Sequence, residues 1–150
     1  MDLQAIMTRC AAEIPAAECY RTFEEFGVRF ANAFCGIAKL WRGENEALGR
    51  IELPAGIELS EDRYQIHPAL LDAAFQVLIG AIRPVEGLYL PTLLEGVKLH
   101  HRPGRRFWSH VRIRHHNTTQ VEAALELIDD AGNIARRYVA SSLRSISRLK

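Results

Sequence analysis

The stretch "YQIHPALLDAAFQVLIGAI", residues 64–82, decides the fold. It is mostly apolar and is bounded by Pro68 near its start and Pro84 after its end, so it predicts one buried helix of about four turns. Asp72 and Gln76 are exceptions in the middle of this helix. Burying an ionised carboxylate without a partner costs several kcal/mol. A carboxylate at this position therefore needs a structural or chemical reason.

Asp72 and Gln76 are four residues apart and therefore share one face of the expected helix. An acid among apolar groups keeps its proton to higher pH than an acid in water. Such an acid could protonate a leaving hydroxyl, while the amide hydrogen-bonds the carboxyl or the substrate. The structural alternative is that Asp72 only hydrogen-bonds backbone groups of a neighbouring strand. The spacing alone favours neither interpretation.

The composition is that of one ordinary globular domain. The chain has 150 residues, of which 48% are hydrophobic and 25% are charged. The net charge of +1 gives no bias towards nucleic acid or membrane, and no apolar run approaches the roughly 20 residues of a membrane span. Three widely spaced cysteines fit neither a disulfide framework nor a zinc site. We expect a cytoplasmic protein without a bound metal.

The elements around the central helix are mostly strands. Two helices are expected before it, over residues 2–12 and 15–27, followed by two strands within residues 36–54 that a turn at 42–45 joins. Further strands are expected between 89 and 103 and over residues 107–115, 120–128 and 134–146, the last three as a meander. One long helix with about five mostly antiparallel strands predicts an α+β domain, residues 1–150, in which a curved sheet wraps the helix. The hotdog fold has this shape.

The segment "HPALLDAAFQ", residues 67–76, resembles the second signature of the dehydratase domains of modular polyketide synthases, H-P-x-L-L-D-x-x-x-Q. The flanking segments "LWRGENEALGRIELP" and "YLPTLLEGVKLHHRPG" are similar to the family's neighbouring strands, and the resemblance runs from about Tyr20 to the end of the sequence. Those domains are double hotdogs, whose first half carries a catalytic histidine in H-x-x-x-G-x-x-x-x-P. This chain resembles the second half alone. His100 and Gly104 match that spacing by chance, because Ser109 stands where the proline belongs.

The resemblance implies removal of water from a 3-hydroxyacyl thioester on an acyl carrier protein, which gives a 2,3-enoyl thioester. A histidine in the N-terminal hotdog half, outside this chain, would take the α-proton. Asp72 would protonate the departing hydroxyl and Gln76 would orient it. No cofactor is implied apart from the phosphopantetheine arm that carries the substrate.

The resemblance also predicts a substrate-binding surface made of Phe30, Phe34, His67 and Pro68. The family's Y-G-P-x-F loop corresponds to residues 30–34, in which Ala31 and Asn32 replace the glycine and the proline. Core packing is the favoured alternative for the two phenylalanines, and ordering the start of the helix is the alternative for His67. A basic cluster could meet the acidic carrier protein, although a solvated face is its default interpretation. Its members are Arg102, Arg105, Arg106, Arg112 and Arg114.

Two other functions keep the same fold. A related domain could shift a double bond or guide cyclisation with the same acid. A non-catalytic hotdog could be a structural half or an acyl-binding module, as the absent histidine and the altered aromatic loop favour. A second hotdog encoded upstream of Met1 would favour the enzyme, and a natural start at Met1 would favour the binding module. In isolation, we expect a homodimer that imitates the missing half.

Overall fold

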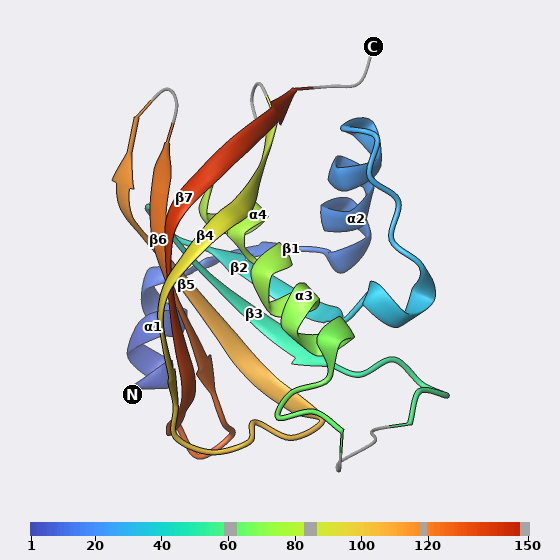
Figure 1. The fold of residues 1–150 in the computed structure, drawn as a ribbon, viewed down its shortest axis with the longest axis vertical. Helices are drawn as coiled ribbons and strands as arrows, with labels where there is room; N and C mark the ends of the chain where they lie inside the picture. The colour runs from blue at the N-terminus through green and yellow to red at the C-terminus, as the bar shows by residue number, and fades with distance from the viewer. Residues whose placement is uncertain (59–62, 83–86, 118–119, 148–150) are drawn as a thin grey trace.

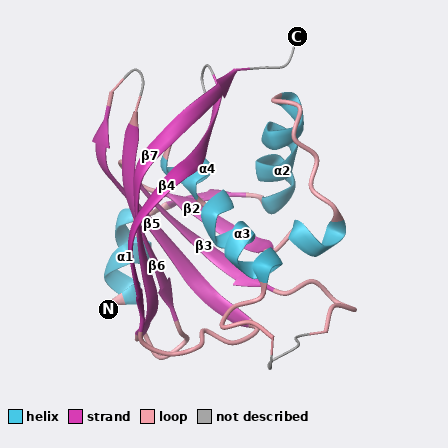
Figure 2. Ribbon diagram, viewed as in Figure 1, coloured by secondary structure: helices cyan, strands magenta, loops and turns pink. Residues whose placement is uncertain are grey.

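The computed structural model describes residues 1–58, 63–82, 87–117 and 120–147 (Figure 1). Its centre is one antiparallel sheet of seven strands in the order β1-β2-β3-β5-β6-β7-β4. The strands are β1 Ala12–Ile14, β2 Ile37–Arg42, β3 Glu46–Glu52, β4 Gly87–Leu99, β5 Arg106–His116, β6 Val121–Ile128 and β7 Ile134–Ser147. Figure 2 shows this sheet curving around the central helix, which confirms the α+β class.

The helices lie on both sides of the sheet. They are α1 Leu3–Arg9, α2 Ala16–Glu25, the 3-10 turn η1 Asn32–Phe34, α3 Pro68–Gln76 and α4 Leu78–Ala81. The helices α2, α3 and α4 lie on the concave side, which we call the inner face, whereas α1 lies against the convex outer face (Figure 1). In the described part of the chain, no helix is long and apolar enough to cross a membrane.

Two predictions about the helices are wrong in detail. The first helix ends at Arg9, and the chain then enters the short strand β1, which pairs with β2 from Ala12↔Arg42 to Ile14↔Leu40. The central helix is interrupted at Val77, since the Gly80 amide donates to the carbonyl of Val77, three residues back. The expected single helix is therefore two shorter ones.

Strand alternation places the core where the sequence indicates. On β3, Ala47, Gly49 and Ile51 face α3 and α4, and a Cβ atom added to Gly49 would overlap the side chain of Val77. The helix pair thus packs directly on the backbone of β3. The inner rows of β5 and β6 complete the core with Phe107, Val111, Val121, Ala123, Leu125 and Leu127, all of them buried.

The predicted meander of β5, β6 and β7 is confirmed, whereas β4, the strand before it in sequence, does not pair with β5. β4 ends at Leu99, short of the Pro103 expected from the sequence, and it pairs with β7 at the edge of the sheet. No described strand pairs with its other side. Several apolar side chains of β4 remain 42–52% exposed, namely Leu93, Leu94, Val97 and Leu99.

Candidate active site

Two of the predicted binding residues begin the helix that carries the acid. His67 is the N-cap of α3, where its Nδ1 atom accepts a hydrogen bond of 3.1 Å from the Ala69 amide. Pro68 follows as the first helical residue, where its missing N–H costs no hydrogen bond. Both residues therefore have a local structural role, and Asp72 lies one turn further along.

Gln76 is the centre of a hydrogen-bonded network, which we call the inner network. Its Nε2 atom donates to Asp72 Oδ2 at 2.7 Å and to the carbonyl oxygen of Phe34 at 2.9 Å. Its Oε1 atom accepts from the Tyr20 hydroxyl at 3.0 Å. Gln76 is buried, whereas Asp72 is only half-buried. The Asp72 carboxylate is therefore hydrogen-bonded to Gln76 and is partly exposed to solvent.

Tyr20 closes the network on the side of α2. Its hydroxyl oxygen accepts a hydrogen bond of 3.0 Å from the Ile37 amide. Burial raises the pKa of Tyr20 well above its ordinary value, more strongly than the hydrogen bond from Ile37 lowers it. Tyr20 therefore stays neutral and keeps its proton to donate. Tyr20 was not predicted as a site residue, because nothing in the pattern of α2 links it to a helix more than 40 positions away.

The two phenylalanines of the altered loop have different surroundings. Phe30 packs edge-on against Phe23, with ring centroids 5.0 Å apart, and against Tyr20 at 6.0 Å. Phe34 is 39% exposed, and its carbonyl oxygen holds Gln76. Core packing therefore accounts for Phe30, whereas Phe34 lies beside the acid.

The arginine run divides between two regions and forms no single patch. Arg102 and Arg105 contact the loop that leads to α3, at Gln65 and at the carbonyl of Ile57. Arg106 and Arg112 lie in the outward row of β5, where Arg106 pairs with Asp130 at 3.2 Å, and Arg114 follows at a register shift between Ile113 and His115. Only the first part of the run lies near the start of the helix that carries Asp72.

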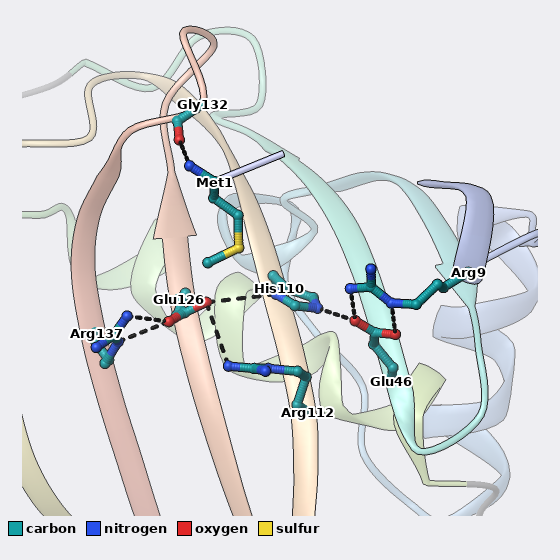
Figure 3. Close-up of polar contacts among 8 residues, drawn as sticks. All are labelled: Met1, Arg9, Glu46, His110, Arg112, Glu126, Gly132 and Arg137. Atoms are coloured by element: carbon teal, nitrogen blue, oxygen red, sulfur yellow. Dashed lines mark hydrogen bonds and ion pairs between the residues drawn. The ribbon is translucent and has the colours of Figure 1, made fainter. Parts of the chain in front are cut away.

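A second polar network, the outer ionic cluster, lies on the opposite side of the sheet (Figure 3). It consists of Arg9, Glu46, His110, Glu126 and Arg137. Arg9 of α1 makes a two-pronged pair with Glu46, with contacts of 2.7 and 3.0 Å, and His110 Nε2 lies 2.6 Å from the same carboxylate. Across the next strand, Arg137 holds Glu126 at 2.6–2.7 Å.

His110 and Glu126 face each other at the centre of this cluster without a hydrogen bond. His110 Nδ1 and Glu126 Oε2 are 3.7 Å apart, and neither atom has a hydrogen-bond partner, although the Arg112 guanidinium lies 4.0 Å from the same Oε2. Hydrogen bonds from Arg9 and His110 hold the pKa of Glu46 below its ordinary value, against the effect of burial. The adjacent His110 and the hydrogen bond from Arg137 likewise hold the pKa of Glu126 below its ordinary value. Both carboxylates are thus ionised at neutral pH.

The outer ionic cluster was not predicted, although part of its signal is in the sequence. Alternation puts His110 in the outward row of β5 with Trp108 and Arg112, which suggests a solvated side chain. Its side chain is nevertheless only 1% exposed, and α1 packs on the same face of the sheet through Ile6, which joins Leu48 and Ile128 in a buried cluster. The cluster lies on the face opposite α3, so it is no part of the candidate active site.

The adjacent histidine pairs form no metal site. His101 contacts Asp129 at 3.0 Å, and His116 contacts the Tyr89 hydroxyl at 3.4 Å, both in exposed positions. Among the described residues, no group of three or more histidine, cysteine or acidic side chains could hold an ion.

Comparison with known proteins gives the family. The family described as "Polyketide synthase dehydratase N-terminal domain" matches residues 1–150. The chain belongs to this polyketide synthase dehydratase family. Polyketide synthase PksM of Bacillus subtilis strain 168 is 25% identical over 97% of the chain. The match covers 4% of PksM, so the chain corresponds to a small part of that relative.

Solved dehydratase domains share the fold. The dehydratase domains of the CurK and CurF modules of curacin polyketide synthase each superpose with a TM-score of 0.88, at 30% and 32% identity. They cover 98% of this chain, which spans only 53% and 52% of theirs. Two CurK variants are described as inactive mutants, one with a histidine changed to phenylalanine and one with an aspartate changed to asparagine.

Proposed function

We propose that this chain is the aspartate-bearing second hotdog of a polyketide synthase dehydratase. In this role, Asp72 is the acid that protonates the departing β-hydroxyl of a 3-hydroxyacyl thioester, and the product is a 2,3-enoyl thioester. The observation that carries the proposal is the half-buried Asp72 carboxylate, held at 2.7 Å by the buried amide of Gln76 on the helix of the family signature. Such an acid is fixed in orientation and still open to a substrate.

The comparison with CurK supports a division of labour between two halves. Its dehydratase is inactivated by loss of a histidine or of an aspartate, and this chain spans 53% of a CurK chain. The family description speaks of an N-terminal domain, so the placement in the second half rests on the H-P-x-L-L-D-x-x-x-Q match of residues 67–76. The proton-accepting histidine would come from the first half.

The open edge of β4 is the proposed contact with that first half. Antiparallel pairing there would continue the sheet and cover the exposed side chains of Leu93, Leu94, Val97 and Leu99. A second copy of this chain could occupy the same edge in isolation, which would give a homodimer with two copies of Asp72 and no signature histidine. Light scattering tests this assembly, and a strict monomer at tens of micromolar would contradict it.

The substrate would arrive on the phosphopantetheine arm of an acyl carrier protein, and the proposed reaction needs no other cofactor. Arg102 and Arg105, beside the loop that leads to α3, are the part of the arginine run best placed to meet the carrier or the phosphate of its arm. The synthase would work in the cytoplasm, where the free thiols of Cys10, Cys19 and Cys35 stay reduced.

The deciding experiment is Asp72→Asn in the complete double-hotdog parent, assayed with a 3-hydroxyacyl thioester on its carrier protein. We expect turnover to fall by about 10²- to 10⁴-fold, because the amide cannot donate the proton that the carboxylic acid supplies. The matched control is Asp130→Asn, an exposed acid of the outer face, which should keep full turnover. Unchanged turnover in Asp72→Asn would overturn the proposal. Mass analysis of the product separates dehydration from double-bond migration, which loses no water.

A further inference from the structure

The hydrogen bonds around Gln76 have only one consistent set of directions. The Ile37 amide can only donate, so the Tyr20 oxygen accepts there and its own hydrogen is free for Gln76. On the far side of the amide, the Phe34 carbonyl can only accept, so the facing atom of Gln76 must be nitrogen. The two constraints are independent and agree. Tyr20 faces Oε1, and both hydrogens of Nε2 point to Phe34 and Asp72.

This arrangement makes the two oxygens of Asp72 unequal. Oδ2 accepts a hydrogen bond of 2.7 Å from Gln76 Nε2, so the lone pair on that side is occupied. The amide cannot rotate to offer its oxygen instead, because Oε1 would then face the Phe34 carbonyl, and the Tyr20 hydroxyl would lose its acceptor. An acidic proton on Asp72 therefore sits on Oδ1, the oxygen turned away from Gln76.

We propose that Tyr20 is a positioning residue that acts through Gln76 and makes Asp72 Oδ1 the proton donor, an inference that rests on the proposed dehydratase function. In the step itself, the base removes the α-proton and the electron pair of that C–H bond forms the carbon–carbon double bond. The β-carbon–oxygen bond breaks, the proton on Oδ1 moves to the departing oxygen, and water leaves. Asp72 remains as a carboxylate, with Oδ2 still bonded to Gln76.

The surroundings of Tyr20 suit this role. Its ring contacts Phe23 and Phe30, with centroids 6.4 and 6.0 Å away, so the hydroxyl has little freedom to move. Burial raises the pKa of Tyr20, which keeps the hydroxyl protonated over the working range of pH. The residue joins α2 and β2 to the acid on α3 without touching the acid itself.

The kinetic test is Tyr20→Phe in the double-hotdog parent, with Tyr138→Phe as the control. The control removes another buried hydroxyl, one that accepts from Arg136 and has no contact with Gln76. We expect Tyr20→Phe to lower kcat about three- to tenfold with KM unchanged, since one hydrogen bond that orients the acid is lost. Tyr138→Phe should leave both constants unchanged. An equal loss in both variants would show a merely structural effect and overturn the proposal.

A double-mutant cycle tests whether Tyr20 acts through Gln76. In a Gln76→Leu background, Tyr20→Phe should cause no further loss of kcat, because the link to Asp72 is already broken. If the two substitutions instead lowered kcat by independent factors that multiply, Tyr20 would not act through Gln76, and this link, which we call the relay, would be overturned.

A third measurement does not depend on activity. In the 150-residue chain, the side-chain amide hydrogens of Gln76 should exchange slowly with solvent in NMR spectra. Tyr20→Phe should speed this exchange more than tenfold, and Tyr138→Phe should not change it. Unchanged exchange in Tyr20→Phe would overturn the relay. If exchange responds as expected but the wild-type parent dehydrates nothing, the relay stands and the proposed function fails.

Discussion

On the inner face of the sheet, Gln76 is surrounded by a hydroxyl, one backbone carbonyl and one half-buried carboxylate, whereas on the outer face His110 lies between two buried carboxylates. The inner network satisfies every polar atom of the amide, and each bond has a defined direction. The outer ionic cluster leaves His110 Nδ1 and Glu126 Oε2 without hydrogen-bond partners. The first arrangement orients one group, and the second neutralises charge beneath a helix. Substitutions on the two faces should therefore fail in different ways.

The largest effect on stability is expected for Glu126→Gln on the outer face. The side chain is 2% exposed, pairs with Arg137 and faces His110, so a neutral amide there breaks the ion pair of a buried carboxylate and leaves its polar atoms poorly matched to their neighbours. We expect the free energy of unfolding to fall by about 3–5 kcal/mol in urea titrations. Glu122→Gln, on the same strand but only partly buried, should stay within about 0.5 kcal/mol of the wild type. A similar loss of stability in both variants would show that the buried contacts of Glu126 have no special weight.

A smaller effect, steric in origin, is expected for Gly49→Ala on the inner face. The new methyl group would overlap Val77, so the helix pair must move away from β3. We expect a loss of about 1–3 kcal/mol in the same titration. Val77→Ala should relieve the overlap, so Gly49→Ala should cost less in that background than in the wild type. An equal cost in both backgrounds would show that the strain arises elsewhere.

Acid should weaken the outer face more than the inner one. Because their partners lower the pKa of Glu46 and Glu126 in the folded state, the resulting stability is fully present above the ordinary pKa of about 4.3 and is lost as the pH falls through the lowered values. Urea titrations between pH 6 and 3 should show a smaller pH dependence for Glu126→Gln than for the wild type, and the wild-type dependence for Tyr20→Phe. A wild-type dependence in Glu126→Gln would contradict this account.

The smallest effect is expected for Arg9→Gln, which removes the contact of α1 with Glu46. The Arg9 side chain is 51% exposed, so solvent screens most of the attraction. We expect the free energy of unfolding to fall by about 0.5–1 kcal/mol. In 1 M salt, the difference between the wild type and the variant should become smaller, because salt screens the ion pair. A stability loss as large as that of Glu126→Gln would mean that the contact of Arg9 with Glu46 stabilises the outer ionic cluster more than the contacts of Glu126 do.

Much of the fold follows from the sequence, because the alternation of apolar and polar residues along a strand shows which of its residues are buried. The alternating residues of β3, β5 and β6 predicted the inner face, and the spacing of Asp72 and Gln76 predicted their contact. The interruption at Val77 was not predictable, since the local pattern of residues 68–82 contains no residue that ends a helix there. Local patterns carry no information about tertiary distances.

The missed residues share a physical cause. Tyr20 reaches Gln76 from another helix, and the outer ionic cluster collects side chains from α1, β3, β5, β6 and β7. Each contact depends on strand register and on the docking of α1, neither of which the sequence pattern determines. His110 shows this directly, because its outward position was predictable and its burial was not.

The pairing of β4 with β7 has a consequence for how the chain is made. β4 follows α4 in the chain, but its hydrogen-bonded neighbour is the last strand that the structure describes, with Gly87 opposite Ser147. A ribosome adds about 5–20 residues per second, so β4 emerges well before β7 and waits with both edges open. Contacts so distant in sequence also form slowly. During that interval, the open edges of β4 can pair with a wrong strand, and a chaperone that covers them would protect the chain.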